Sequence, residues 1–199
     1  MAKNEEGSIK FRCDWIKDKL IPASELKTIN LWRKKLFGLG LIGCYDNGIG
    51  FGNISVRLGK INNFLITGTG TGKYKTLNGR HYTKVIDYDI KSNSLTCRGS
   101  VKASSESLTH AIIYQLDKSV NAVIHIHNLG LWKRLLGKAP TTSKEIEYGT
   151  PEMALEIAKL FKDGDAKEKR IIVMGGHKEG LVFFGKDLDA AGGIILQNL

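Results

Sequence analysis

The feature that most constrains the fold is a series of short, β-rich apolar runs, several of which are separated only by brief turns. These runs are Ile54–Leu58, Phe64–Ile66, Val85–Ile90 and Leu95–Cys97. Two parallel strands need a crossover connection of about a dozen residues or more, whereas antiparallel strands can be joined by a tight turn. The sequence therefore predicts a sheet that is largely antiparallel or mixed.

Helical patterns occur before, between and after these runs. Apolar residues recur at three- and four-residue spacing in Pro22–Phe37, which Ser24 is placed to cap, and in Ser104–Leu116. Thr150, followed by a proline and an acidic residue, marks a third helix start, and Asp187 opens a last helix. An amphipathic helix must bury its apolar face, so we expect these helices to cover the sheet.

Composition places the chain among ordinary globular proteins. It has 199 residues, of which 42% are hydrophobic and 25% charged, so a disordered or fibrous protein is excluded. We expect a single domain over residues 1–199, with residues 1–20 as a loosely ordered N-terminal extension. The cysteines Cys13, Cys44 and Cys97 form no paired motif and are expected to be reduced thiols.

Charge and hydropathy bear on partners and location. The formal net charge is +10, but the basic residues are scattered and form no continuous stripe, so we expect no nucleic-acid partner. No apolar run approaches the roughly 20 residues of a membrane-spanning helix, and we expect no membrane partner. The N-terminal residues contain no apolar secretory segment, so a cytoplasmic location is expected.

Two histidines share one face of a predicted strand. In a strand, residues two apart point to the same side, so His125 and His127 aim together while Ile124 and Ile126 enter the core. Imidazoles arranged in this way can converge on one cation. Two histidines hydrogen-bonded at a strand end would give the same pattern, so the spacing alone leaves both interpretations open.

Three further features each have an ordinary structural interpretation. Ser104–Glu106 fits either a helix cap or an anion site at a helix start. Glycine-containing turns at 50–55 and 66–72 could cradle a phosphate, but they match neither the Walker nor the Rossmann pattern. His177 lies in a turn between two apolar runs that are predicted to form a hairpin, where a histidine is commonly a surface residue.

Taken together in this order and spacing, the features resemble the class II aldolase and adducin family. The resemblance runs from about residue 24 to the end of the chain. Each part is common by itself, whereas the combination in register is specific. The parts are Gly52–Arg57, Leu65–Gly70, Ser104–Glu106 with His110, Ala122–His127, Tyr148–Thr150, Gly176–His177 with Gly180, and Gly185–Leu188.

The resemblance implies a fold and a set of site residues. The fold is α/β, a three-layer α/β/α sandwich with a central, largely antiparallel sheet covered by helices. One Zn²⁺ per chain would be held by His125, His127 and His177, with Glu106 as the catalytic acid–base residue and His110 orienting the site. The residues that would bind the substrate phosphate are Asn53, Thr69, Gly70, Ser104 and Ser105.

The resemblance also implies a reaction. Aldolases of this kind cleave a ketose 1-phosphate to dihydroxyacetone phosphate and an aldehyde by retro-aldol chemistry, with zinc stabilising the negative charge that develops. A dehydratase of the methylthioribulose-1-phosphate type, or another sugar-phosphate lyase, uses similar zinc ligands and stays open as an alternative. A non-catalytic, adducin-like interaction module is a second alternative, against which the complete set of histidines and Glu106 argues.

The family's assembly and the departures from its pattern complete the expectations. Relatives place the active site between subunits, so the resemblance implies a homotetramer that acts on a phosphorylated sugar. The stretch Leu131–Glu147 is short and basic, and the chain ends at Leu199 without the tail that usually supplies a catalytic tyrosine. The resemblance therefore does not define how the aldehyde side is recognised, and a neighbouring subunit could complete that side of the pocket.

Overall fold

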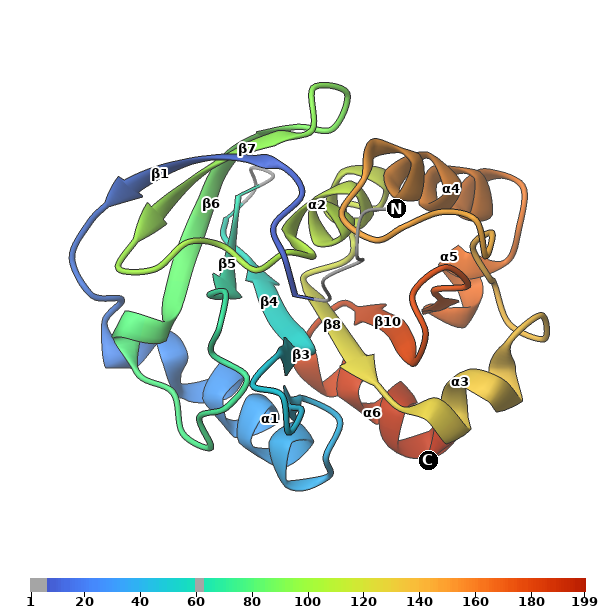
Figure 1. Ribbon diagram of the computed structural model, residues 1–199, viewed down its shortest axis with the longest axis horizontal. Helices are drawn as coiled ribbons and strands as arrows, with labels where there is room; N and C mark the ends of the chain where they lie inside the picture. The colour runs from blue at the N-terminus through green and yellow to red at the C-terminus, as the bar shows by residue number, and fades with distance from the viewer. Residues whose placement is uncertain (1–6, 60–62) are drawn as a thin grey trace.

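One eight-stranded sheet organises the chain in the computed structural model, which describes residues 7–59 and 63–199 (Figure 1). The strand order is β1-β7-β6-β5-β4-β8-β10-β9, and only the β1–β7 pair among these described strands is parallel. The prediction of a largely antiparallel sheet is confirmed. The strands are β1 (Arg12–Lys17), β4 (Asn53–Arg57), β5 (Phe64–Thr67), β6 (Tyr82–Asp89), β7 (Ser94–Gly99), β8 (Ala122–His127), β9 (Ile171–Val173) and β10 (Gly180–Gly185).

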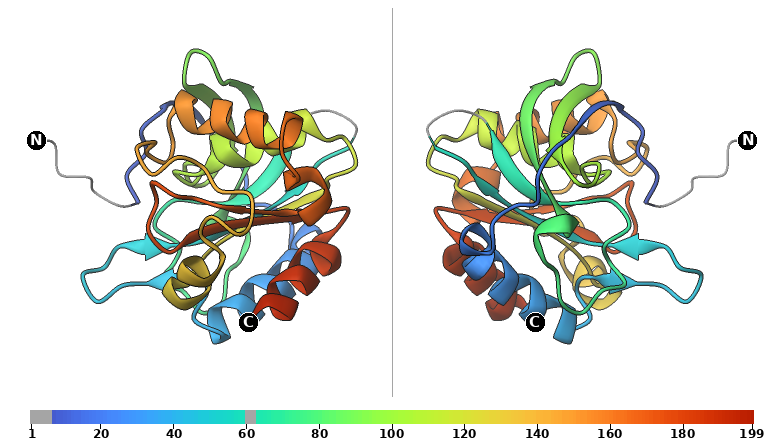
Figure 2. Two further views of the ribbon diagram at one scale, coloured as in Figure 1. Left: turned by 90° about the vertical axis from the view of Figure 1, so that its right-hand side faces the viewer. Right: turned by 90° about the vertical axis from the view of Figure 1, so that its left-hand side faces the viewer.

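Helices cover both faces of this sheet, as Figure 2 shows edge-on. On one face lie α2 (Ser107–Leu116), α4 (Pro151–Lys162) and the short α5 (Ala166–Lys169), and on the other α1 (Lys27–Gly38), α3 (Leu129–Leu135) and α6 (Leu188–Asn198). Each helix layer has its own apolar core against the sheet, so the three-layer α/β/α prediction is confirmed. None of the helices in the described ranges has the length and apolar character needed to cross a membrane.

Strand β8 shows the alternation that the sequence predicts. Val123 packs into the core under α2 and α4, whereas Ile124 and Ile126 pack into the core under α1 and α6. His125 and His127 therefore share the α2 and α4 side of the sheet. A short two-stranded ribbon of β2 (Gly43–Cys44) and β3 (Gly50–Phe51) lies near His127, at the end of β8.

Two helix starts agree with the sequence and two differ from it. Thr150 and Asp187 each accept a hydrogen bond from a first-turn backbone N–H, as predicted for caps. Ser24 does not cap α1, because it lies inside a short 3₁₀ turn, η1 (Ala23–Leu26), that precedes the helix. Helix α2 begins at Ser107 rather than at residue 104, so Ser104 and Ser105 lie in the turn before it. A second 3₁₀ turn is η2 (Gly79–His81).

The expectation for residues 1–20 was wrong for part of the segment. Residues 12–17 form the edge strand β1, which pairs with β7, while residues 1–6 lie outside the described residues. Trp15 fixes the strand, because its Nε1 donates to Gly99 O at 2.9 Å. Cys13 lies beside Cys97, with their Sγ atoms 3.6 Å apart, and both are free thiols like Cys44. Because Arg12 and Asp14 lie on the exposed face of β1, its sequence gives no clear strand signal.

Candidate active site

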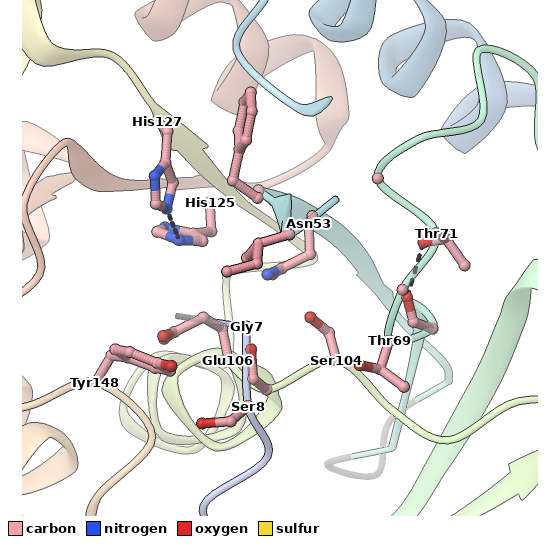
Figure 3. Close-up of a pocket in the computed structure, with 18 of the residues that line it drawn as sticks. Gly7, Ser8, Asn53, Thr69, Thr71, Ser104, Glu106, His125, His127 and Tyr148 are labelled. Carbon is pink, nitrogen blue, oxygen red and sulfur yellow. Dashed lines mark hydrogen bonds between the residues drawn. The ribbon is translucent and has the colours of Figure 1, made fainter. Parts of the chain in front are cut away.

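A pocket of about 410 Å³ lies where strands β4 and β8 meet the start of α2 (Figure 3). All nine residues that the sequence predicted for the site line this pocket, although they come from widely separated segments. We call the two halves the imidazole end and the glycine end. The imidazole end is formed by His125, His127 and His177, and the glycine end by Gly68–Gly72 together with Ser104 and Ser105.

The three histidines of the imidazole end form one buried cluster. The Nε2 atom of His127 lies 3.1 Å from that of His125 and 2.9 Å from that of His177. One ring nitrogen from each residue lies within 4.8 Å of the others, which is the spacing of a group that could hold a metal ion. The two strand histidines lie on one face, and the third comes from a different part of the chain.

These imidazoles have the protonation state that a metal site requires. Burial lowers the pKa of His125 to about 4, and it lowers the pKa of His127 and of His177 well below the usual value. His125 Nδ1 donates to the carbonyl oxygen of Leu181 at 3.2 Å, which leaves its Nε2 with a lone pair. Three neutral imidazoles with converging lone pairs fit a divalent metal ion and leave coordination positions open for a ligand.

His177 reaches the cluster because glycines occupy two tight positions of its turn, Gly176 and Gly180. β10 runs antiparallel to β8, and Gly180 lies opposite His127 in the register. A Cβ atom on Gly180 would lie 2.2 Å from His177 Cδ2, and one on Gly176 would lie 1.9 Å from Ile146 O. Both positions therefore need glycine to leave room for the imidazole and for the neighbouring backbone.

A carboxylate faces the cluster from the start of α2. Glu106 is 2% exposed, and its Oε2 accepts a hydrogen bond from Thr109 Oγ1 at 2.6 Å. One turn further on, His110 Nδ1 lies 2.7 Å from Ser55 Oγ, and burial lowers the pKa of His110 well below its usual value. His110 lies outside the group of three that could hold a metal. This half of the pocket thus combines a possible metal site with a buried group that can transfer protons.

The glycine end offers polar groups without positive side chains. Asn53 lies opposite His125 in the β4–β8 register, and its buried Oδ1 has no hydrogen-bond partner among residues 7–59 and 63–199. Gly70 has a φ of +69°, which turns the loop beside Thr69 toward the pocket. No lysine or arginine occurs among the described lining residues, so hydroxyl, amide and backbone groups would have to bind an anion there.

Comparison with known proteins places this geometry in a family. A family model described as the Class II Aldolase and Adducin N-terminal domain matches residues 47–196, a span that contains all nine predicted site residues. The chain belongs to the class II aldolase and adducin family. Its relatives include the L-fuculose phosphate aldolase of Methanocaldococcus jannaschii, which is 29% identical over 150 residues, or 69% of this chain and 74% of that protein.

Solved structures show the same fold at lower identity. An L-fuculose 1-phosphate aldolase aligns with a TM-score of 0.64 and 20% identity, over 89% of this chain and 82% of that chain. The sugar-phosphate aldolase from Thermotoga maritima aligns with a TM-score of 0.65 and 19% identity, over 88% and 91% of the two chains. The class II aldolase fold is therefore common to all three chains.

In this class II aldolase family member, residues that support or line the pocket also precede the matched span, and sequence reasoning missed them. Arg33 of α1 is 2% exposed, and its guanidinium donates to the carbonyl oxygens of Gly72 at 3.0 Å, Lys75 at 3.3 Å and Thr71 at 3.4 Å. It therefore holds the glycine end from behind. The signal was present, because Arg33 interrupts the apolar stripe that contains Ile29 and Leu36.

The N-terminal segment forms a second wall that was not predicted. Gly7 and Ser8 line the pocket. Lys10 Nζ lies 2.9 Å from Glu147 Oε2 and 4.1 Å from the centre of the Tyr148 ring, and that ring lies 4.5 Å from the His177 ring. The segment before β1 is thus tied to the imidazole end through Tyr148, and no periodic pattern in the sequence marks this contact.

Proposed function

We propose that this protein is a zinc-dependent class II aldolase that cleaves a ketose 1-phosphate to dihydroxyacetone phosphate and an aldehyde. One observation carries the proposal: three buried, neutral imidazoles converge in the same pocket as the buried carboxylate of Glu106. His125, His127 and His177 would hold the metal. When bound, zinc supplies Lewis-acid stabilisation of the negative charge that develops as the carbon–carbon bond breaks.

The chain's own residues account for binding and proton transfer. Asn53, Ser104 and Ser105, with the loop at Thr69 and Gly70, would bind the phosphate through neutral donors. In the cleavage direction the C3–C4 bond breaks, the C4 hydroxyl gives its proton to solvent as the aldehyde forms, and C3 gains a proton from a protonated side chain that solvent then reprotonates. Glu106 would deliver the proton to C3. Thr109 holds the Glu106 carboxyl group in place through a hydrogen bond.

We also propose that the protein works as a homotetramer. The family resemblance noted in the sequence supports this assembly. The aldehyde side of the pocket would then be completed by a neighbouring chain. Light scattering at micromolar concentration tests the assembly, and a fully active monomer would contradict it.

The reaction is tested with a panel of ketose 1-phosphates, assayed separately for aldehyde release and for dehydration. We expect release of dihydroxyacetone phosphate that stops when the metal is removed by a chelator and returns when Zn²⁺ is restored. Loss of water without carbon–carbon cleavage would support the dehydratase alternative and reject the aldolase. Absence of both reactions together with absence of bound metal would favour the interaction module.

A further inference from the structure

The three rings of the imidazole end are oriented by three different kinds of contact. A backbone carbonyl, Leu181 O, accepts from His125 Nδ1, and the Tyr148 ring packs against the His177 ring. His127 is oriented by a side chain, because its Nδ1 lies 2.9 Å from the hydroxyl of Tyr45. This contact can therefore be removed by substitution without changing the backbone of the sheet.

The direction of the hydrogen bonds at Tyr45 fixes the tautomer of His127. The Tyr45 hydroxyl donates to Glu179 Oε2 at 3.0 Å. A hydroxyl has a single proton, so the same oxygen must accept from His127 Nδ1–H. The proton then resides on Nδ1, and the lone pair of Nε2 points toward His125 and His177. The hydrogen-bond partner of the other ring nitrogen sets the tautomer, orientation and basicity of a metal-bound histidine.

Tyr45 comes from a part of the chain that precedes the span matched by the family model. It follows β2, and its backbone N–H donates to Ile49 O at 2.9 Å across the turn of the β2–β3 ribbon. Its ring packs at 4.5 Å on Phe51, whose ring lies 5.4 Å from that of His127. The ribbon thus fixes the Tyr45 hydroxyl against the outer edge of the His127 imidazole.

Glu179 adopts a backbone conformation that normally favours glycine. Its φ is +72°, in the left-handed region that is unfavourable for residues with a Cβ atom. The half-buried side chain of Glu179 accepts a hydrogen bond from Tyr45. The backbone carbonyl oxygen of Glu179 accepts from Asn128 N–H at 3.0 Å. A strained residue next to a candidate site points to a role for its side chain, because glycine would meet the backbone demand better.

We propose that Tyr45 and Glu179 are positioning residues that tune metal affinity by holding His127 in the tautomer that presents Nε2. This inference rests on the metal site of the proposed function. It adds a ligand-orienting relay, His127–Tyr45–Glu179, that joins the ribbon to the turn before β10. Neither residue touches the substrate in this assignment, and their effect reaches the reaction only through His127.

The test measures the zinc dissociation constant of the metal-stripped full chain by competition with a chromogenic chelator. We expect Tyr45→Phe to weaken zinc binding about 10–100-fold. Glu179→Gln keeps an acceptor for the tyrosine hydroxyl, so it should retain most of the zinc affinity of the parent. Glu179→Gly removes the acceptor and should weaken zinc binding as Tyr45→Phe does. Tyr88→Phe is the matched control, because it removes a tyrosine hydroxyl that bonds to Ala111 O, away from the cluster.

Two further readouts separate positioning from a loss of fold. Without metal, Glu179→Gly should unfold at a temperature equal to or above that of the metal-free parent, since it relieves a left-handed residue. Cobalt substituted for zinc should give a visible absorption band that changes in Tyr45→Phe and stays unchanged in Tyr88→Phe. If Tyr45→Phe fails to fold, the Glu179 pair decides the question by the same measurements.

The outcomes distinguish the relay from the reaction. Zinc affinities of Tyr45→Phe and Glu179→Gly within twofold of the parent, with ketose 1-phosphate cleavage intact, would overturn the relay and leave the proposed function standing. Weakened zinc binding in both variants of a parent that cleaves no ketose 1-phosphate would support the relay and reject the reaction. A parent that binds no zinc overturns both.

Discussion

The imidazole end and the glycine end of the pocket are built by different means. The histidines are positioned by the paired strands β8 and β10, by hydrogen bonds at Nδ1 of His125 and His127, and by the Tyr148 ring against His177. The glycine end is a loop without strand pairing over most of its length, held from behind by the guanidinium of Arg33. Substitutions at the first end should change chemistry with little effect on folding, whereas substitutions behind the second should change folding and substrate binding together.

Removal of a metal ligand should have the largest effect on the imidazole end. His127→Ala opens the coordination shell, so we expect loss of bound zinc and loss of cleavage activity. Elemental analysis of protein expressed with added zinc, together with the aldehyde assay, checks both losses. The unfolding temperature of the metal-free variant should stay close to that of the metal-free parent. A variant that keeps a full equivalent of zinc would remove His127 from the ligand set.

Glu106→Gln should separate proton transfer from metal binding. Glutamine can accept the hydrogen bond from Thr109 but cannot carry the proton, so turnover should fall about 10²–10⁴-fold while zinc stays bound. Single-turnover assays with parallel metal analysis measure the two quantities. Thr109→Val is the companion variant, because it keeps the carboxylate and removes only its hydroxyl partner. Near-full activity of Glu106→Gln would show that Glu106 transfers no proton.

Arg33→Met tests whether the glycine end depends on the residue behind it. The variant leaves three carbonyl oxygens without their charged donor, so the free energy of unfolding should fall by about 1–3 kcal/mol. KM for a phosphorylated substrate should rise, and zinc affinity should stay unchanged. Urea unfolding and steady-state kinetics measure these effects, with the exposed Arg98→Met as control. A fall in zinc affinity equal to the rise in KM would show that the two ends are not independent.

Ser105→Ala should have the smallest effect. It removes one neutral hydroxyl donor from the glycine end, which is worth about 1 kcal/mol or roughly fivefold in phosphate affinity. Isothermal titration with inorganic phosphate and with matched phosphorylated and unphosphorylated ketoses measures this loss. Equal binding of the two ketoses by the parent protein would show that the glycine end does not recognise phosphate.

The same contrast explains how much the sequence could predict. The β8 alternation follows from a period of two, so the shared face of His125 and His127 was predictable from residues alone. The position of His177 depends on the pairing of β10 with β8, which only the family resemblance supplied. Arg33, Tyr45 and Glu179 act through contacts between distant segments, and such contacts leave no periodic signal. Strand β1 was missed because only one of its faces is partly buried.

The absence of lysine and arginine among the described lining residues determines how substrate binding should depend on ionic strength. A chain with a net charge of +10 attracts a dianionic substrate over distances at which salt screens the attraction, with a Debye length of about 8 Å at 0.15 M. Hydrogen bonds from neutral hydroxyl and backbone donors act at contact and are screened far less. Added salt should therefore slow the arrival of a phosphorylated sugar while leaving its residence time in the pocket almost unchanged.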